Sequence, residues 1–158
     1  TVIQSFIEAI ANITRDIRNI GGVGMTNKLP PSNDWQARNI DDWNTRTIHA
    51  FLIDETRRRF NAEYVPGGKG AKSQRWRTEQ GMIKRELTKR GAAVVRKFIE
   101  ICWAEYYTPN PQQYPYPTFG FMLGFMDRYW TQAEREVAKE TERAEIAEQN
   151  TEIDTEWF

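Results

Sequence analysis

The sequence has little of the residues that most often carry metal or redox chemistry. The chain of 158 residues contains one cysteine, Cys102, and one histidine, His49. A lone cysteine forms no internal disulfide, which is typical of a reducing cytoplasm. Zinc sites combine several cysteine or histidine ligands, so we expect no metal site at His49 and no cofactor. Cys102 lies in an apolar helical run and is expected to be a buried small hydrophobe.

Long apolar runs are also absent. No stretch approaches the roughly 18 residues that a membrane-spanning helix requires. The first residues lack the short apolar core and small-residue cleavage site of a signal peptide. Six Trp, six Tyr and eight Phe are enough for a compact core. We therefore expect a compact cytoplasmic domain that has no membrane contact.

Net charge is absent over the whole chain, which has 22 basic and 22 acidic residues, but the charge is unevenly distributed. Residues 69–97 contain ten basic and two acidic residues, a net charge of +8. Basic residues gathered in this way commonly bind phosphates, because each can release a condensed counterion. Trp76, between Arg75 and Arg77, can stack on an unpaired base. The alternative is a solvated helix face. The predicted nucleic-acid-binding residues are Lys69, Lys72, Arg75, Trp76, Arg77, Lys84, Arg85, Lys89 and Arg90.

The N-terminal segment, residues 1–22, predicts an amphipathic helix over residues 2–20. Its apolar residues recur at spacings of three and four, an a/d seam of nearly three heptads. The seam either docks on the protein's own core or mediates self-association. Residues 23–41 are rich in Gly, Pro and Asn and are expected to form a linker, with Trp35 anchoring its end. The seam consists of Ile3, Phe6, Ile10, Ile13, Ile17 and Ile20.

An all-α core domain of about four helices is expected over residues 42–132. The first helix spans residues 42–62 and is capped by Asn44 or Thr45. Arg57, Arg58 and Arg59 suit the dipole at its C-terminal end or extend the basic surface.

Two helices follow, and Ser73 is the expected cap of the first. Gly91 separates it from the next, residues 92–107, in a pattern that resembles a helix-turn-helix. The proline-rich residues 108–117 predict a stiff connection. Thr118 then caps one long final helix.

The final helix is expected to be apolar at first and then to enter solvent. Residues 133–158 carry nine acids and three bases. Acids followed by two aromatic residues are typical of an interaction tail, which can occupy its own basic surface or reach a partner. The alternative is a frayed acidic end. The predicted partner-binding residues are Glu152, Asp154, Glu156, Trp157 and Phe158.

Residues 80–130 also resemble a known family. The order KRGAAVVRKFIEICWAEYY, then YPYP, then FGFMLGFMDRYW is similar to the C-terminal module of DnaD-type primosome proteins and phage replisome organisers. In that family a final helix carries an apolar residue at every fourth position and ends in tryptophan. Met122, Met126 and Trp130 occupy these places here, although the family usually has Tyr and Ile at the first two. The resemblance implies a phage-encoded accessory factor that binds DNA and recruits or loads a replicative helicase.

Three functions therefore compete. The first is a DNA-binding replication accessory that uses the basic segment and forms a possible homo-oligomer. The second is a transcription regulator that places the helix-turn-helix pattern in a DNA groove. The third is a scaffold or inhibitor that binds a host or virion protein. No enzyme is expected, because no carboxylate pairs with a histidine, cysteine or glycine-rich loop at a catalytic spacing.

Overall fold

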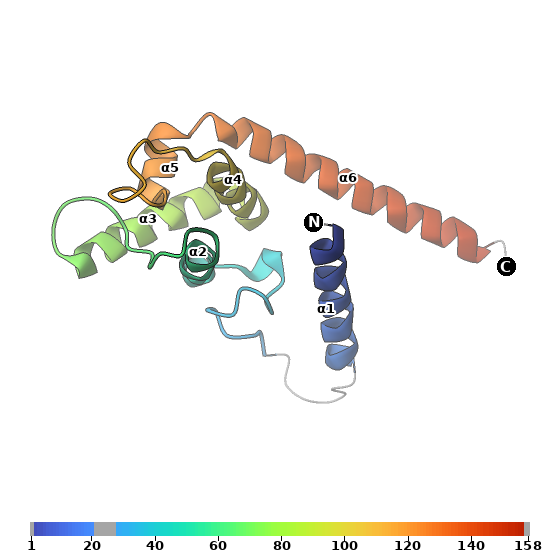
Figure 1. Cartoon of the computed structure of the whole chain (residues 1–158). Coiled ribbons are helices and arrows are strands. Elements are labelled where there is room, and N and C mark those ends of the chain that lie inside the picture. The colour runs from blue at the N-terminus through green and yellow to red at the C-terminus, as the bar shows by residue number, and fades with distance from the viewer. Residues whose placement is uncertain (1, 21–27, 157–158) are drawn as a thin grey trace.

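The computed structural model describes the backbone of residues 2–20 and 28–156 and the side chains of residues 2–12 and 28–152. These ranges contain helices and no strand (Figure 1), which confirms the predicted all-α class. The helices outnumber the four that we expected. They are α1 (Val2–Ile20), the 3-10 helix η1 (Ile40–Asp42), α2 (Thr45–Phe60), α3 (Lys72–Arg90), α4 (Ala92–Glu105), α5 (Phe119–Phe125) and α6 (Tyr129–Glu156).

The core forms where α2, α3, α4, α5 and the start of α6 meet. α4 is the central element, because it packs against α3, α5, η1 and most extensively α6. Phe98 of α4 stacks on Trp130 of α6 at 3.6 Å between ring centroids. Cys102 is fully buried, as its apolar surroundings predicted. The other apolar side chains in the described chain that have no exposed surface are Ile48, Leu52, Ile83, Val95, Phe98, Ile99, Phe119, Met122 and Ala133.

Local sequence signals set most helix ends. Asn44 caps α2 through a capping box with Thr47, so the first of the two predicted caps is used. Gly91, at φ +85°, separates α3 from α4 as expected. Thr118 caps α5 by accepting a hydrogen bond from the Phe121 backbone N–H. The predicted cap Ser73 was wrong, because α3 already begins at Lys72 after Ala71.

The final helix is broken rather than continuous. α5 ends at Phe125, and α6 begins at Tyr129 after a turn in which the Trp130 N–H donates to the Asp127 carbonyl oxygen. Gly120 and Gly124 both lie in this short helix, and glycine weakens a helix interior. The break allows Met122 and Trp130 to reach the same core from two helix axes.

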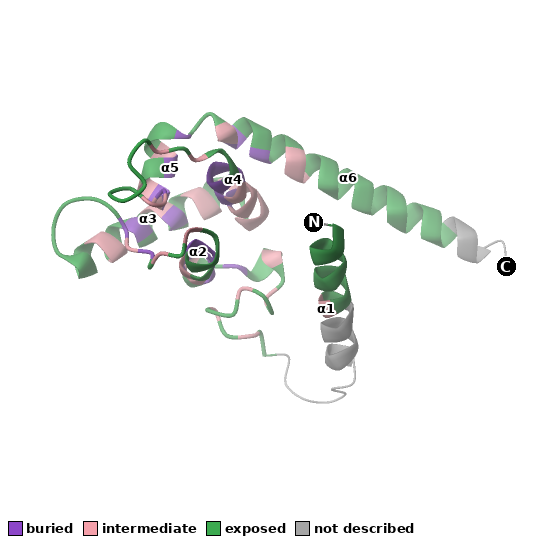
Figure 2. Cartoon of the chain, viewed as in Figure 1, coloured by how far each residue is buried: buried purple, intermediate pink, exposed green. Residues whose placement is uncertain are grey.

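Trp35 anchors the end of the linker, as expected. Its indole N–H donates to Asp54 Oδ2 at 2.8 Å, and its ring meets Phe51 edge-on at 5.0 Å. α1 behaves differently, because its described large apolar side chains are exposed (Figure 2). Among the described residues of α1, docking of the seam on the protein's own core is therefore not observed.

Candidate nucleic-acid interface

The solvent side of α3 carries four of the predicted basic residues. Arg77, Lys84, Arg85 and Lys89 are all exposed. Within the described part of the chain, none of them lies within ion-pair distance of a carboxylate. We call the exposed half of this helix the α3 outer face. Its members are Ser73, Gln74, Arg77, Thr78, Gln80, Gly81, Lys84, Arg85, Thr88 and Lys89.

Both acids of α3 point away from this face. Glu79 is only 3% exposed, and the Tyr64 hydroxyl donates to its Oε1 at 2.6 Å. His49 Nε2 lies 3.3 Å from the same oxygen. Glu86 is half-buried and accepts from Arg90 Nε at 2.9 Å. The outer face therefore carries four positive charges and no carboxylate of its own.

Two further predicted residues extend the cationic surface at the start of α3. Lys69 and Lys72 are exposed and have no ion pair among the described residues. Lys69 lies between Gly68 and Gly70, whose φ angles of 103° and 99° favour glycine. A shallow depression of about 480 Å³ follows, lined by Ala71, Ser73, Gln74, Arg77 and Thr78.

The remaining predicted residues of the basic segment turn toward the protein. Arg75 Nη1 donates to the Pro66 carbonyl oxygen at 3.1 Å. Trp76 is half-buried, and its ring meets the His49 ring edge-on at 4.9 Å. Arg90 lies over the Trp130 ring, with 4.1 Å from its Cζ to the ring centroid.

Arg90 is also neutralised by acids, because Nε pairs with Glu86 and Nη1 with Glu134 at 2.6 Å. Arg75, Trp76 and Arg90 therefore serve the fold in this structure. Their side chains are not part of the α3 outer face.

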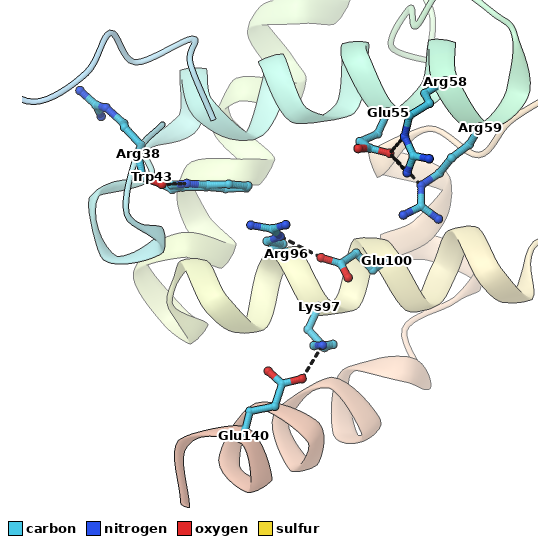
Figure 3. Close-up of polar contacts among 9 residues, drawn as sticks. All are labelled: Arg38, Trp43, Glu55, Arg58, Arg59, Arg96, Lys97, Glu100 and Glu140. Carbon is cyan, nitrogen blue, oxygen red and sulfur yellow. Dashed lines mark hydrogen bonds and ion pairs between the residues drawn. The ribbon is translucent and has the colours of Figure 1, made fainter. Parts of the chain in front are cut away.

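The last two cations of the segment are also paired (Figure 3). Arg96 donates to Glu100 at 2.8 Å, and Lys97 donates to Glu140 at 2.6 Å. Burial disfavours the Lys97 ammonium, but the bond to Glu140 and the charge of Glu100 outweigh burial, so the pKa of Lys97 is raised. The Arg96–Glu100 pair lies within α4, and the Lys97–Glu140 pair joins α4 to α6.

Of the three arginines at the end of α2, only Arg57 is exposed without an ion pair in the described chain. Arg58 and Arg59 both pair with Glu55, at 2.6 and 3.0 Å (Figure 3). The hydrogen bond to Glu55 raises the pKa of Arg58. Most of this arginine run therefore does not extend the basic surface.

A cleft of about 760 Å³ lies between α1, the linker, α2 and α4. Its walls include Arg58, Arg59 and Arg96, but each of these pairs with Glu55 or Glu100. The whole lining contains four basic and four acidic residues, so its charges are balanced and the cleft offers less to a polyanion than the α3 outer face does.

The predicted oligomerisation residues lie on α1, and the predicted partner-binding residues Glu152, Asp154 and Glu156 lie on α6. Ile3, Phe6 and Ile10 are exposed, as is Glu152. The other predicted side chains, which fall outside the described residues, are Ile13, Ile17, Ile20, Asp154, Glu156, Trp157 and Phe158.

No group of three or more His, Cys, Asp or Glu side chains could hold a metal ion in the described chain. Over the same residues, no helix combines the length and apolarity needed to cross a membrane.

The inward position of Glu79 and Glu86 is the feature that the sequence analysis missed. These acids are seven residues apart and share a helix face with Trp76, Ile83 and Leu87, so a count at helical spacing could have found them. A net charge of +8 over the segment concealed this arrangement, because it averages over all sides of the helix.

A scan against protein-family models, a search of curated proteins and a search of solved structures each found no match. The resemblance to DnaD-type modules therefore stays a prediction. Its three quoted positions, Met122, Met126 and Trp130, are buried in the core. Their side chains are not part of any exposed surface.

Proposed function

We propose that the protein binds nucleic acid without catalysis, and that the α3 outer face with Lys69 and Lys72 holds the phosphate backbone. The observation that carries this proposal is the sorting of charge around α3: four cations face solvent, while Glu79 and Glu86 face the protein. A merely solvated helix surface usually mixes charges of both signs. A surface that carries only positive charges is better suited to bind a polyanion.

Six cations set the scale of the expected salt dependence. Each neutralised phosphate contributes about −0.9 to the slope of log affinity against log salt on duplex DNA, so six contacts give a slope of about −5. Such binding is largely independent of sequence, because phosphate contacts carry no base information.

The alternative of a helix-turn-helix regulator is less well supported. Only Gly91 joins α3 to α4, whereas the motif uses a turn of three or four residues. α4 also buries Val95, Phe98, Ile99 and Trp103, so it is not available to enter a groove. The scaffold alternative would use α1 and the end of α6 instead.

Recruitment or loading of a replicative helicase in the cytoplasm of a phage-infected bacterium is the setting that the DnaD-type resemblance adds to this proposal. It rests on that resemblance alone. Nucleic-acid binding through α3 stands independently of it.

The direct test is fluorescence anisotropy of labelled DNA, single-stranded and duplex, at several salt concentrations. A variant with Arg77, Lys84, Arg85 and Lys89 all changed to Gln should bind roughly 100- to 1,000-fold more weakly at 0.1 M salt and show a shallower salt slope. The matched control changes four exposed cations elsewhere, Arg46, Arg57, Lys139 and Arg143, to Gln. Equal losses in both variants, or no binding by the wild type, would reject the proposal.

A further inference from the structure

The α3 outer face has an internal order that simple phosphate binding does not require. Gln74, Gly81 and Thr88 are seven residues apart, about two helical turns, so they form one line along the middle of the face. Arg77 and Lys84 lie along one side of this line. Arg85 and Lys89 lie along the other. The cations therefore flank a central line of uncharged residues.

Gly81 is unexplained by the fold itself. A Cβ built there meets no atom within 4 Å, and its φ is not in the region that favours glycine. Glycine is also the least favourable residue in a helix interior after proline. Neither packing nor backbone conformation requires glycine at this position, and its lack of a side chain leaves room for a close approach from outside the protein at the centre of the face.

The dimensions of this arrangement match the major groove of duplex DNA. The groove is about 12 Å wide and admits an α-helix, whose diameter with side chains is about 10–12 Å. From Arg77 to Lys89 the helix advances about 18 Å, which corresponds to about five base-pair steps. Cations on both flanks then lie beside the two phosphate backbones that border the groove.

We infer that the ligand of the α3 outer face is duplex nucleic acid of B form, with α3 lying along its major groove. The cations on both flanks contact the two backbones, and Gly81 lets the helix axis approach the base edges. This inference rests on the proposed function and names the form of the ligand. Single-stranded nucleic acid is less suited, because stacking of bases needs exposed aromatic rings and the only aromatic residue of α3, Trp76, packs on His49.

The first experiment compares two duplexes of the same sequence and charge, one of which carries glucosylated hydroxymethylcytosine. The sugars fill the major groove and leave the phosphates unchanged. We expect the wild type to bind the glucosylated duplex about tenfold or more weakly, because the groove no longer admits a helix. Equal affinity for the two duplexes would overturn the inference, while salt-dependent binding to both would leave the proposed function intact.

The second experiment places a side chain at the centre of the face. Gly81→Gln should weaken duplex binding about tenfold and keep or raise the thermal midpoint of unfolding, since glutamine favours helix. Gly124→Gln is the matched control, because Gly124 is also exposed, helical and open at its Cβ, but lies on α5. It should leave affinity unchanged.

If Gly81→Gln bound the duplex as tightly as the wild type does, the inferred close approach of α3 to the base edges would be overturned. If binding were then lost only when the four flanking cations are neutralised, the α3 outer face would bind the phosphates without entering the groove. The proposed function would stand and the groove inference would fall.

Discussion

At the scale of single residues, Tyr64 links three segments of the core. Its hydroxyl donates to Glu79 Oε1 on α3 at 2.6 Å and accepts from the Phe119 backbone N–H, at the start of α5, at 2.9 Å. Both partners are buried, as is Tyr64 itself. The hydroxyl therefore satisfies a carboxylate and an amide that water cannot reach, and it keeps Glu79 away from the α3 outer face.

Removing this hydroxyl should destabilise the fold. Tyr64→Phe removes the hydrogen bonds that the hydroxyl makes with two buried polar groups, the Glu79 carboxylate and the Phe119 N–H, so we expect a loss of about 2–4 kcal/mol in the free energy of unfolding. The measurement is urea unfolding followed by tryptophan fluorescence. Tyr107→Phe is the control, because Tyr107 is 83% exposed, and it should change stability by less than about 0.5 kcal/mol. A Tyr64→Phe protein as stable as the control would contradict the role assigned to the hydroxyl.

The burial of the Tyr64 hydroxyl should also make the folded protein less stable at alkaline pH. Burial, together with the nearby Glu79, raises the pKa of Tyr64 well above its usual 10.0. The folded protein keeps this proton while the unfolded chain releases it above pH 10, so folding becomes less favourable as pH rises beyond that value. Between pH 9 and pH 11 this residue should remove about 1.4 kcal/mol of stability.

The measurement is the urea midpoint at both pH values in the wild type and in Tyr64→Phe. The variant lacks the titrating group and should have the shallower pH dependence. Identical slopes in the two proteins would show that Tyr64 does not carry the effect.

Cys102 should be inert while the protein is folded. The thiol is fully buried, and burial raises its pKa to about 12. At pH 8 roughly one thiol in ten thousand is ionised, and the thiolate is the reactive form. We expect an aromatic disulfide reagent to label Cys102 at least about 100-fold more slowly in buffer than in urea. Comparable rates would mean that the α4 core opens without unfolding.

The division of arginines between core and surface could be predicted in part from sequence. Arg59, Arg90 and Arg96 each have a glutamate four residues away, pair with it and lie over a tryptophan ring. Arg77 and Arg85 have no acid at that spacing and face solvent. Spacing of three or four residues brings side chains together on a helix, so these three pairs could be read from the sequence. Arg75 and Lys89 also have a glutamate at such a spacing but form no ion pair with it in the described chain, so spacing alone does not decide the pairing. The stacking could not be read from the sequence, because it joins residues that are distant in the chain.

At the scale of elements, α1 is the helix least connected to the fold. Ile3 is 73% exposed, Phe6 66% and Ile10 51%, although these residues belong to the heptad seam. An exposed stripe of this kind usually marks an interaction surface. Of the two roles considered for the heptad seam, exposure favours self-association.

Deleting residues 1–22 should therefore separate association from stability. We expect the deleted protein to be monomeric by light scattering where the full chain is oligomeric. The free energy of unfolding, measured in urea, should change by less than about 0.5 kcal/mol, because none of the described side chains in the deleted segment belongs to the buried core. A loss of several kcal/mol, or the same mass for both proteins, would contradict this role of α1.

Helix ends within the core could be predicted from the sequence only where a capping residue or a glycine sets the end without help from tertiary packing. Asn44, Gly91 and Thr118 act on their immediate neighbours, and each was identified. The break between α5 and α6 was missed because residues 119–137 continue an apolar helical pattern. Packing of Met122 and Trp130 around α4 decides that break, and this is a tertiary effect.

At the scale of the whole molecule, positive and negative charge occupy different ends. α6 leaves the core after its contact with α4 and runs away from α3 (Figure 1). Its side chains from Ala138 to Glu152 are exposed, and residues 133–158 contain nine acids against three bases. α6 is helical as far as Glu156, so the described part of the acidic segment does not fold back on its own α3 outer face.

This arrangement makes α6 a source of long-range repulsion toward a polyanion rather than a lid over the binding face. Removing residues 141–158 deletes six acids and one base, which changes the net charge from zero to +5 and retains the Lys97–Glu140 pair. DNA affinity should rise about three- to tenfold at 50 mM salt, and the gain should vanish near 0.5 M, where screening is nearly complete. Core stability should not change, because the removed side chains that are described are exposed. A gain that persists at high salt would instead indicate direct occupation of the α3 outer face by the acidic segment, since only short-range contacts resist screening.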